Sequence, residues 1–256
     1  MMLHSGAKLL VVPAHICTPD IEGAHTMKRS AAVIGYECLF DLGCDEWHLP
    51  PAVIGSVAGV MEVEGIVFDR TRLTMLLRDA LEKRKRKVAE TMEETRLEDI
   101  VESVMEEMDV FDPSVNRRIV DIVSSYCAEN SAALDAAARL LLRLRKDSRV
   151  GLVCNVPLGL PHGAIAGLLK NEGMDASIDD MQFSTEMGMR RPHARQYRYV
   201  LSNLDVRPQE CVAITGMPED AETLRKLSFG DICLIGPGDD GRPGKAAALD
   251  KLHSSL

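Results

Sequence analysis

A long stretch without glycine restricts the fold of this chain more than any other feature. The sequence contains 19 glycines, but none of them falls between residues 66 and 150, where Pro113 is the single proline. Because glycine marks tight turns and close approaches of the backbone, its absence over this length predicts helices joined by simple polar links. We therefore expect a helical subdomain in this part of the chain.

Apolar periodicity within the same stretch supports this expectation. Apolar residues recur at the spacing of one helix face at Leu97, Ile100, Val101, Val104, Met105 and Met108. Asp112-Pro113-Ser114 is typical of the start of a further helix. Another helical stretch is expected from Ala132 to Leu144. The periodicity thus predicts at least three helices between residues 97 and 144.

Beyond residue 150, short apolar runs alternate with helix-like stretches. The runs have the length of strands and occupy residues 150–154, 182–184, 211–215 and 232–235. Strands that alternate with helices over short loops predict a parallel sheet covered by helices on both faces. Gly65-Ile66-Val67-Phe68 is a further strand candidate, just before the helical block. We therefore expect an α/β fold: a Rossmann-like parallel sheet interrupted after its first strand by an inserted helical cap.

These patterns divide the chain into three parts. Residues 63–71 and 150–256 form the expected α/β core, and residues 72–149 form the expected helical cap. Residues 1–62 are interpreted as an N-terminal extension of unknown role. This extension holds a candidate edge strand at Lys8–Val12 and a candidate helix at Thr26–Phe40.

Charge and composition exclude several classes of partner. Thirty Lys and Arg residues stand against 39 Asp and Glu, a formal net charge of −9, which speaks against a nucleic-acid partner held through its phosphates. No apolar run approaches the 18 residues that would indicate a membrane span. The seven cysteines lack the paired spacing of a disulfide framework. We therefore expect a cytoplasmic protein with reduced thiols and no membrane partner.

Asp69 is the first candidate for chemistry, because it follows the apolar run Ile66-Val67-Phe68. In open parallel sheets the carboxyl ends of the strands border the ligand crevice. A carboxylate at this place could attack phosphorus or carbon and form a covalent intermediate. The alternative interpretation is a helix N-cap, since a helix over residues 73–81 follows closely.

Four segments in order resemble the motifs of the haloacid dehalogenase-like (HAD) hydrolase superfamily, over residues 63 to 256. Gly65–Thr71 resembles the first motif, a hydrophobic strand that ends in a nucleophilic aspartate, here Asp69. Gly151–Pro157 resembles the second, in which Ser or Thr precedes Asn; here the pair is Cys154-Asn155. Ser184–Pro192 is similar to the stretch with a lysine before proline, here Arg191, and Thr215–Glu222 takes the place of the acidic fourth motif.

The sequence departs from these motifs at the catalytic positions. The resemblance implies a second aspartate two residues after the nucleophile, which serves as general acid and base; Thr71 stands there and has no useful pKa for proton transfer near neutrality. Cys154 replaces the hydroxyl that would hold a phosphoryl oxygen and is a poor hydrogen-bond donor. Arg191 keeps the positive charge of the lysine, but as a broad fork.

The metal positions depart as well. The fourth-motif aspartate that helps bind magnesium aligns with Met217, whose thioether is no ligand for a hard cation. Glu222 falls where a second acid of this motif can stand, and Asp220 is a nearby substitute. If Mg²⁺ binds, the expected ligands are Asp69, Asp220 and Glu222.

Three functions remain open from the sequence. The first is a slow phosphatase that uses Asp69 on a small phosphoester, with Arg191 balancing charge and Glu222 aiding a metal or water. The second is a metal-independent hydrolase resembling the haloacid dehalogenases, in which Asn155 and Arg191 support attack on carbon. The third is a non-catalytic protein that binds a ligand or partner. For the first two, the expected partner is a small anionic substrate.

Overall fold

The core of the molecule is a six-stranded sheet in which every neighbouring pair of strands is parallel. The structure, a computed structural model, describes residues 8–12, 29–235 and 243–255. The strand order is β1-β8-β7-β2-β5-β6. The strands are β1 (Lys8–Val12), β2 (Ala31–Gly35), β5 (Arg149–Cys154), β6 (Asp180–Phe183), β7 (Cys211–Thr215) and β8 (Asp231–Ile235). The four strands predicted beyond residue 150 are confirmed, and so is the edge strand at Lys8–Val12.

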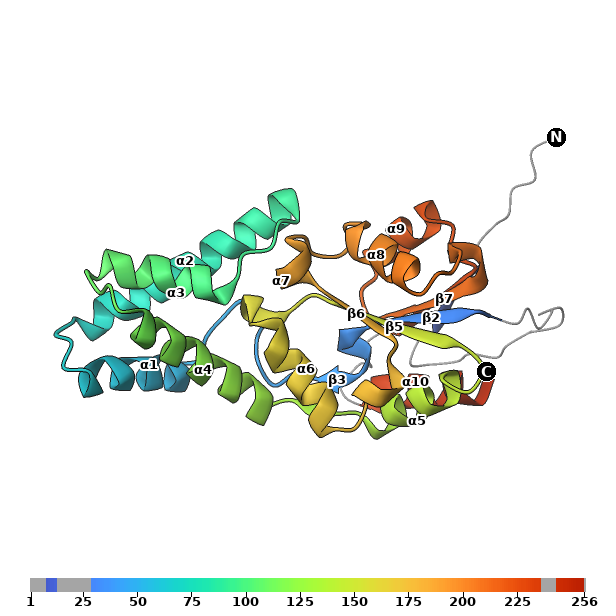
Figure 1. Cartoon of the computed structure of the whole chain (residues 1–256), viewed down its shortest axis with the longest axis horizontal. Coiled ribbons are helices and arrows are strands. Elements are labelled where there is room, and N and C mark those ends of the chain that lie inside the picture. The colour runs from blue at the N-terminus through green and yellow to red at the C-terminus, as the bar shows by residue number, and fades with distance from the viewer. Residues whose placement is uncertain (1–7, 13–28, 236–242, 256) are drawn as a thin grey trace.

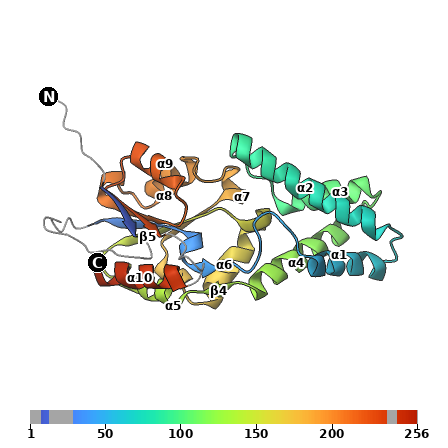
Figure 2. The same ribbon diagram turned by 180° about the vertical axis from the view of Figure 1, so that it is seen from behind.

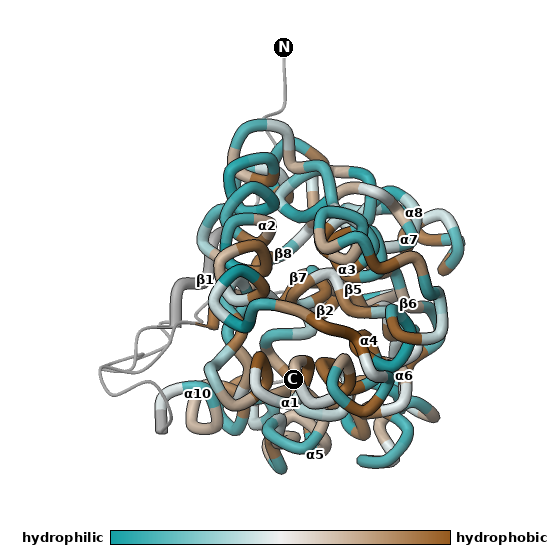
Figure 3. The backbone as a smooth tube through the Cα atoms, turned by 90° about the vertical axis from the view of Figure 1, so that its left-hand side faces the viewer, coloured by the Kyte–Doolittle hydropathy of each residue, from teal (hydrophilic) through white to brown (hydrophobic). Residues whose placement is uncertain are grey.

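Helices cover both faces of this sheet, as the alternating pattern predicted (Figure 1). One face carries α8 (Arg195–Asn203) and α9 (Asp220–Lys226). The other carries α5 (Asp135–Leu144) and α10 (Pro243–Ser255), which lie side by side below the sheet (Figure 2). Viewed end-on, the central strands are largely hydrophobic segments surrounded by helices of mixed character (Figure 3). α6 (His162–Asn171) connects β5 to β6.

The central strand β2 shows why both faces are covered. Successive side chains of a strand point to opposite faces. Accordingly, Ala31 and Val33 join the apolar cluster of α8, whereas Ala32 and Ile34 join the larger cluster that includes α5. All five residues of β2 are buried. A strand of small and β-branched residues without a charge suits this central position.

Four further helices form a layer beyond the carboxyl ends of the strands, and we call this layer, residues 51–129, the helical cap (Figure 1). They are α1 (Pro51–Val63), α2 (Arg70–Thr91), α3 (Leu97–Glu107) and α4 (Pro113–Glu129). The predicted apolar face of α3 is buried, and Asp112 caps α4 by accepting a hydrogen bond from the Ser114 amide at 2.8 Å. Both helix predictions are confirmed.

The segments that enter and leave the cap are held together. After β2 the chain forms a 3₁₀ turn, η1 (Tyr36–Cys38), and the short strand β3 (Phe40–Asp41). β3 pairs antiparallel with β4 (Ala132–Ala133), which follows α4. The stretch expected as one helix from Ala132 to Leu144 therefore divides: β4 closes the cap, and α5 belongs to the core.

Two predicted elements are wrong. Residues 66–69 do not form a strand but connect α1 to α2, at the end of the cap that lies away from the sheet (Figure 1), and Val67 is fully exposed. Within Thr26–Phe40, the described residues form the central strand β2, the 3₁₀ turn η1 and the start of β3, in place of the expected helix. The expected N-terminal extension thus supplies two strands of the sheet. A short apolar run does not distinguish strand from helix or turn, because neighbouring strands decide which run is paired.

In the part of the chain that the structure describes, no helix has both the length and the apolar content needed to cross a bilayer.

Close packing between β5 and α8 generates a stability prediction. A Cβ atom on Gly151 would lie 2.3 Å from Val200 Cγ2 and 3.0 Å from Leu204 Cδ1. We expect Gly151→Ala to lower the free energy of unfolding by about 1–3 kcal/mol, because the added methyl overpacks this contact. Gly167→Ala on α6 is the control: nothing lies within 4 Å of its Cβ, so it should gain about 0.5–1 kcal/mol. Equal stabilities of the two variants in urea denaturation would contradict this packing.

Candidate functional site

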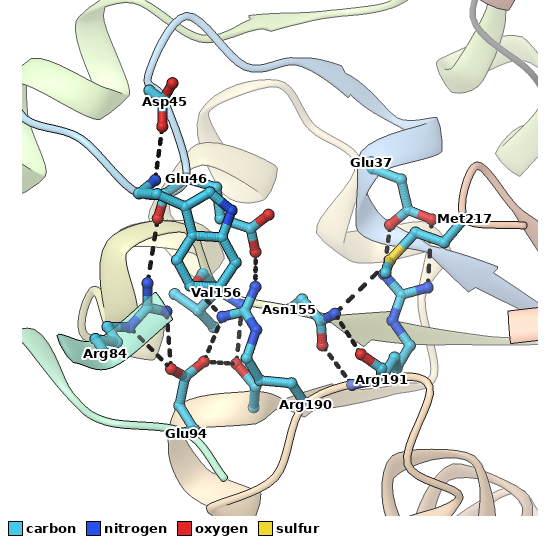
Figure 4. A network of polar contacts seen from close by, with 12 residues as sticks. Glu37, Asp45, Glu46, Arg84, Glu94, Asn155, Val156, Arg190, Arg191 and Met217 are labelled. Carbon is cyan, nitrogen blue, oxygen red and sulfur yellow. Dashed lines mark hydrogen bonds and ion pairs between the residues drawn. The ribbon is translucent and has the colours of Figure 1, made fainter. Parts of the chain in front are cut away.

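The candidate site lies where the carboxyl ends of β2, β5 and β7 meet, at the edge of the sheet that faces the cap. Because these strands are parallel neighbours, the residues that follow them gather at one edge. Glu37 lies in the turn after β2, Asn155 follows β5, and Thr215 ends β7. Arg191 reaches the same place from the segment before α8 (Figure 4).

The Arg191 guanidinium lies between two carboxylates. Its Nη1 is 2.9 Å from Asp220 Oδ2, and its Nη2 is 2.5 Å from Glu37 Oε2. The hydroxyl of Thr215 donates to Asp220 Oδ2 at 2.6 Å, and the Gly216 amide donates to Glu37 Oε1 at 2.9 Å. The side chains of Arg191 and Asp220 are buried, and that of Glu37 is 22% exposed. We call these three charged residues the Arg191 network.

Burial and charge shift the pKa values of this network in different directions. Burial raises the pKa of Asp220, against the opposing effects of Arg191 and Thr215. Burial would also raise the pKa of Glu37, but the Arg191 guanidinium and the Gly216 amide together hold it below its ordinary value. Despite its burial, Arg191 has a pKa well above the ordinary value, because the Glu37 and Asp220 carboxylates stabilise its charged form.

Asn155 fixes the backbone of Arg191, so the structure brings these two predicted site residues together. Asn155 Oδ1 accepts a hydrogen bond from the Arg191 amide at 2.7 Å, and Asn155 Nδ2 donates to the Arg191 carbonyl at 3.1 Å. Nδ2 also lies 3.7 Å from the Met217 sulfur. Cys154, the preceding residue, is fully buried, and burial raises the pKa of its thiol well above the ordinary value. A neutral, buried thiol is a poor nucleophile.

Asp69 and Thr71 are not brought to this site. Asp69 is exposed and caps α2: its Oδ1 accepts hydrogen bonds from the Thr71 amide at 2.7 Å and the Arg72 amide at 3.3 Å. Both residues lie at the start of α2, beyond the connection at the end of the cap away from the sheet (Figure 1). The alternative interpretation of Asp69 as an N-cap is the one that the structure shows.

The three expected magnesium ligands do not converge either. Asp220 is held by Arg191, whereas Glu222 is 75% exposed and pairs with Lys226 at 2.7 Å. Asp69 is the N-cap residue of α2, far from the sheet edge in the helical cap. Among the described residues, no group of three or more His, Cys, Asp or Glu side chains is arranged to hold a metal ion.

Sequence reasoning missed Gly35 and Glu37. Gly35 ends the central strand β2, and Glu37 stands two residues later, the spacing that the first motif has between its nucleophile and its second acid. A Cβ at Gly35 would lie 2.3 Å from Glu37 Oε1 and 2.7 Å from Arg191 Nη1. The Glu37–Arg191 ion pair thus occupies the space that a side chain at position 35 would need. The apolar run Ala31–Ile34 before Gly35, followed by an acid two residues after Gly35, is the sequence signal that indicates this site.

A second charged network joins the cap to the core beside the first (Figure 4). Glu94, between α2 and α3, accepts hydrogen bonds from Arg84 of α2 at 2.8 Å and from Arg190 at 2.6 Å. Its Oε2 also accepts a hydrogen bond from the Ser184 hydroxyl at 2.6 Å. All three charged side chains are at most 2% exposed. The ring of Trp47 lies 4.9 Å from the Arg84 guanidinium carbon and 5.2 Å from that of Arg190. We call this the Glu94 network.

The capping role of Asp69 is testable. Asp69→Ala should lower the free energy of unfolding by about 1 kcal/mol, because two amides at the start of α2 lose their acceptor. Asp69→Asn should remain within a few tenths of a kcal/mol of the natural protein, because asparagine caps helices about as well. Chemical denaturation measures both. A loss of several kcal/mol in Asp69→Asn would show that the carboxylate does more than cap the helix.

The pKa shifts predict opposite pH dependences for two variants. The pKa of Glu37 is lowered below 4.5, so its carboxylate stabilises the fold above that pH and loses this effect as the pH falls through the lower folded value. The stability advantage of the natural protein over Glu37→Gln should therefore shrink below pH 4.5. The pKa of Asp220 is raised from 3.8, so stability relative to Asp220→Asn should decline as pH rises above 3.8. Denaturation curves at several pH values measure the stability difference between the natural protein and each variant. Differences that do not change with pH would contradict the Arg191 network.

Comparisons with known proteins give a fold. No family model matches the chain, and no curated protein matches it. A dehalogenase with an intermediate complex matches with a TM-score of 0.51 at 17% identity, covering 90% of this chain and 97% of that one. A defluorinating L-2-haloacid dehalogenase matches with a TM-score of 0.53 at 14% identity, over 89% and 95%. A HAD hydrolase from Bacillus subtilis bound to magnesium matches with a TM-score of 0.51 at 12% identity, over 82% and 90%. The chain therefore has the fold of the haloacid dehalogenase-like (HAD) superfamily, a Rossmann-like parallel sheet with an inserted helical cap.

Proposed function

We propose that this chain is a non-catalytic protein with the HAD hydrolase fold, which acts by binding a ligand or partner. The observation that carries the proposal is the end of the central strand. Gly35, the last residue of this strand, offers no side chain that could act as a nucleophile, and Glu37 and Arg191 fill the space beside it. Covalent catalysis by a carboxylate needs a free oxygen aimed at the substrate. Here Asp220 and Glu37 both accept hydrogen bonds from Arg191 instead.

The residues at this edge do not fit magnesium. A hard cation needs several oxygen ligands that are free to coordinate it. Arg191 holds both oxygens of Glu37 and one oxygen of Asp220, which leaves Asp220 Oδ1 as the single oxygen of this pair without a hydrogen-bond partner in the described part of the chain. The Met217 thioether stands beside Asn155. A divalent ion would have to displace a buried guanidinium from two carboxylates. The magnesium in the Bacillus subtilis hydrolase therefore does not carry over to this chain.

The ion pairs of the two networks do not favour a small anion either. The Arg191 and Glu94 networks contain the arginines Arg84, Arg190 and Arg191. Each of these arginines is paired with a carboxylate. Arg190 also pairs with Glu46. An anionic substrate would have to compete with these internal carboxylates for every guanidinium. This disfavours both the phosphatase and the dehalogenase interpretations, although Asn155 and Arg191 are present.

An assay of both chemistries tests this proposal. The natural protein should release no more product from p-nitrophenyl phosphate or L-2-chloropropionate than a buffer blank, with or without magnesium. Glu37→Gln and Asp220→Asn serve as matched variants, because each alters one acid of the Arg191 network. Turnover above the blank that falls tenfold or more in either variant would establish an enzyme and reject the proposal.

Restoring the missing carboxylate should not restore activity. Gly35→Asp should lower the free energy of unfolding by about 1–3 kcal/mol. Its Cβ would lie 2.3 Å from Glu37 Oε1, so the Glu37 side chain or the backbone has to move. It also adds a third carboxylate around one guanidinium. The same two assays, together with urea denaturation, measure the outcome. A stable Gly35→Asp variant that hydrolyses either substrate would show that the site around the Arg191 network can still support catalysis.

A further inference from the structure

The helical cap is incompletely closed between α1 and α2. α1 packs mainly on α4, α4 on α3, and α3 on α2, whereas α1 and α2 touch little. Two cavities, of about 300 and 180 Å³, lie between them. The cavities share Ile54 of α1 and Arg78 of α2, so they lie next to each other, and we call the two together the α1–α2 groove. It lies apart from the Arg191 network, none of whose residues lines it.

The walls of this groove are apolar and largely built from core residues. Leu49, Ile54, Leu77 and Leu81 line the larger cavity, and each of these side chains is at most 8% exposed. Leu73 and Ala58 continue the wall in the smaller cavity. Trp47 adds an aromatic surface at one end. Such a surface favours a hydrocarbon chain, because each buried methylene strengthens binding.

One charge in the groove is unpaired. Arg78 is exposed and, among the described residues, makes no ion pair or hydrogen bond. The other charged residues of the lining are engaged: Arg70 pairs with Glu62, and Glu82 lies 3.3 Å from His48, which contacts Asp45 at 3.0 Å. Arg78 borders both cavities and therefore stands at their junction. A free guanidinium beside apolar walls is complementary to a carboxylate on a hydrocarbon chain.

We propose that the α1–α2 groove binds a small amphipathic carboxylate, with the carboxylate on Arg78 and the hydrocarbon chain along Ile54 and Leu77. A volume of about 300 Å³ is at the small end of ligand pockets, which suits a medium-chain acid. This inference holds whether or not the site around the Arg191 network is catalytic.

The chain carries its own reporter for this binding. Trp47 is the single tryptophan of the sequence and lines the groove. The same ring lies against Arg84 and Arg190 of the Glu94 network. A ligand in the groove changes the surroundings of this ring, so tryptophan fluorescence reports occupancy.

The first experiment compares three ligands of equal chain length. Octanoate, octanol and octylammonium are titrated into the natural protein below micelle-forming concentrations, and Trp47 emission is recorded. Octanoate should give a saturable change, with at least tenfold weaker responses to octanol and octylammonium. Decanoate should bind about 15-fold more tightly than octanoate, because two further methylenes are buried. No saturable change, or equal binding of the three ligands, would reject the proposal.

Matched variants locate the ligand. Arg78→Gln should weaken octanoate binding tenfold or more, whereas Arg198→Gln, which removes an exposed charge on α8, should leave it unchanged. Gly55→Leu adds a side chain in open space at the smaller cavity, and Gly59→Leu does so elsewhere on α1. Only Gly55→Leu should weaken decanoate binding. Both should keep or raise the Tm, because leucine favours helix over glycine. Full binding by Arg78→Gln would overturn the assignment.

Discussion

The sheet edge depends on one guanidinium shared by two carboxylates. Arg191 joins Glu37, which follows β2, to Asp220, at the start of α9, so three segments distant in sequence meet at one buried group. Removing one partner of such a pair leaves an uncompensated buried charge, which is strongly destabilising, while the intact pair contributes less than its Coulomb energy suggests. The positions of the residues at the strand ends therefore depend on the ion pairs of Arg191 with Glu37 and Asp220.

The neighbouring residue extends this constraint to the cap. Arg190 contributes to the Glu94 network, while Arg191 forms its own, so one dipeptide fastens the cap and the strand ends together. Arg84 brings α2 to Glu94, and Trp47 lies beside both Arg84 and Arg190. Every guanidinium in these two networks has a carboxylate partner, so the charge of each arginine is compensated within the protein. This arrangement suits a stable interface better than recognition of an anion.

The prediction for residues 66–69 was wrong for a physical reason. Ile66-Val67-Phe68-Asp69 and Val33-Ile34-Gly35-Tyr36 are both short apolar runs before a helix or turn, and the first ends in the acid that the resemblance seeks. Of these two runs, only the one in β2 has strands beside it, and both neighbours, β5 and β7, are parallel to it. An apolar run becomes a strand when its backbone groups find partners, and a single sequence does not record those partners. Asp69 instead satisfies the amides of its own helix.

The sequence by itself determined the elements whose cause is local: the strands beyond residue 150, the amphipathic face of α3, the capped start of α4 and the helical character of the glycine-free stretch. The resemblance to the second and third HAD motifs also predicted that Asn155 and Arg191 belong to one site, and the two residues are in contact. Only the tertiary structure decided that β2 is the central strand, that Glu37 and Asp220 share Arg191, and that α1 and α2 leave a groove. Those features depend on pairing and packing between residues far apart in the chain, and periodicity carries no information about such partners.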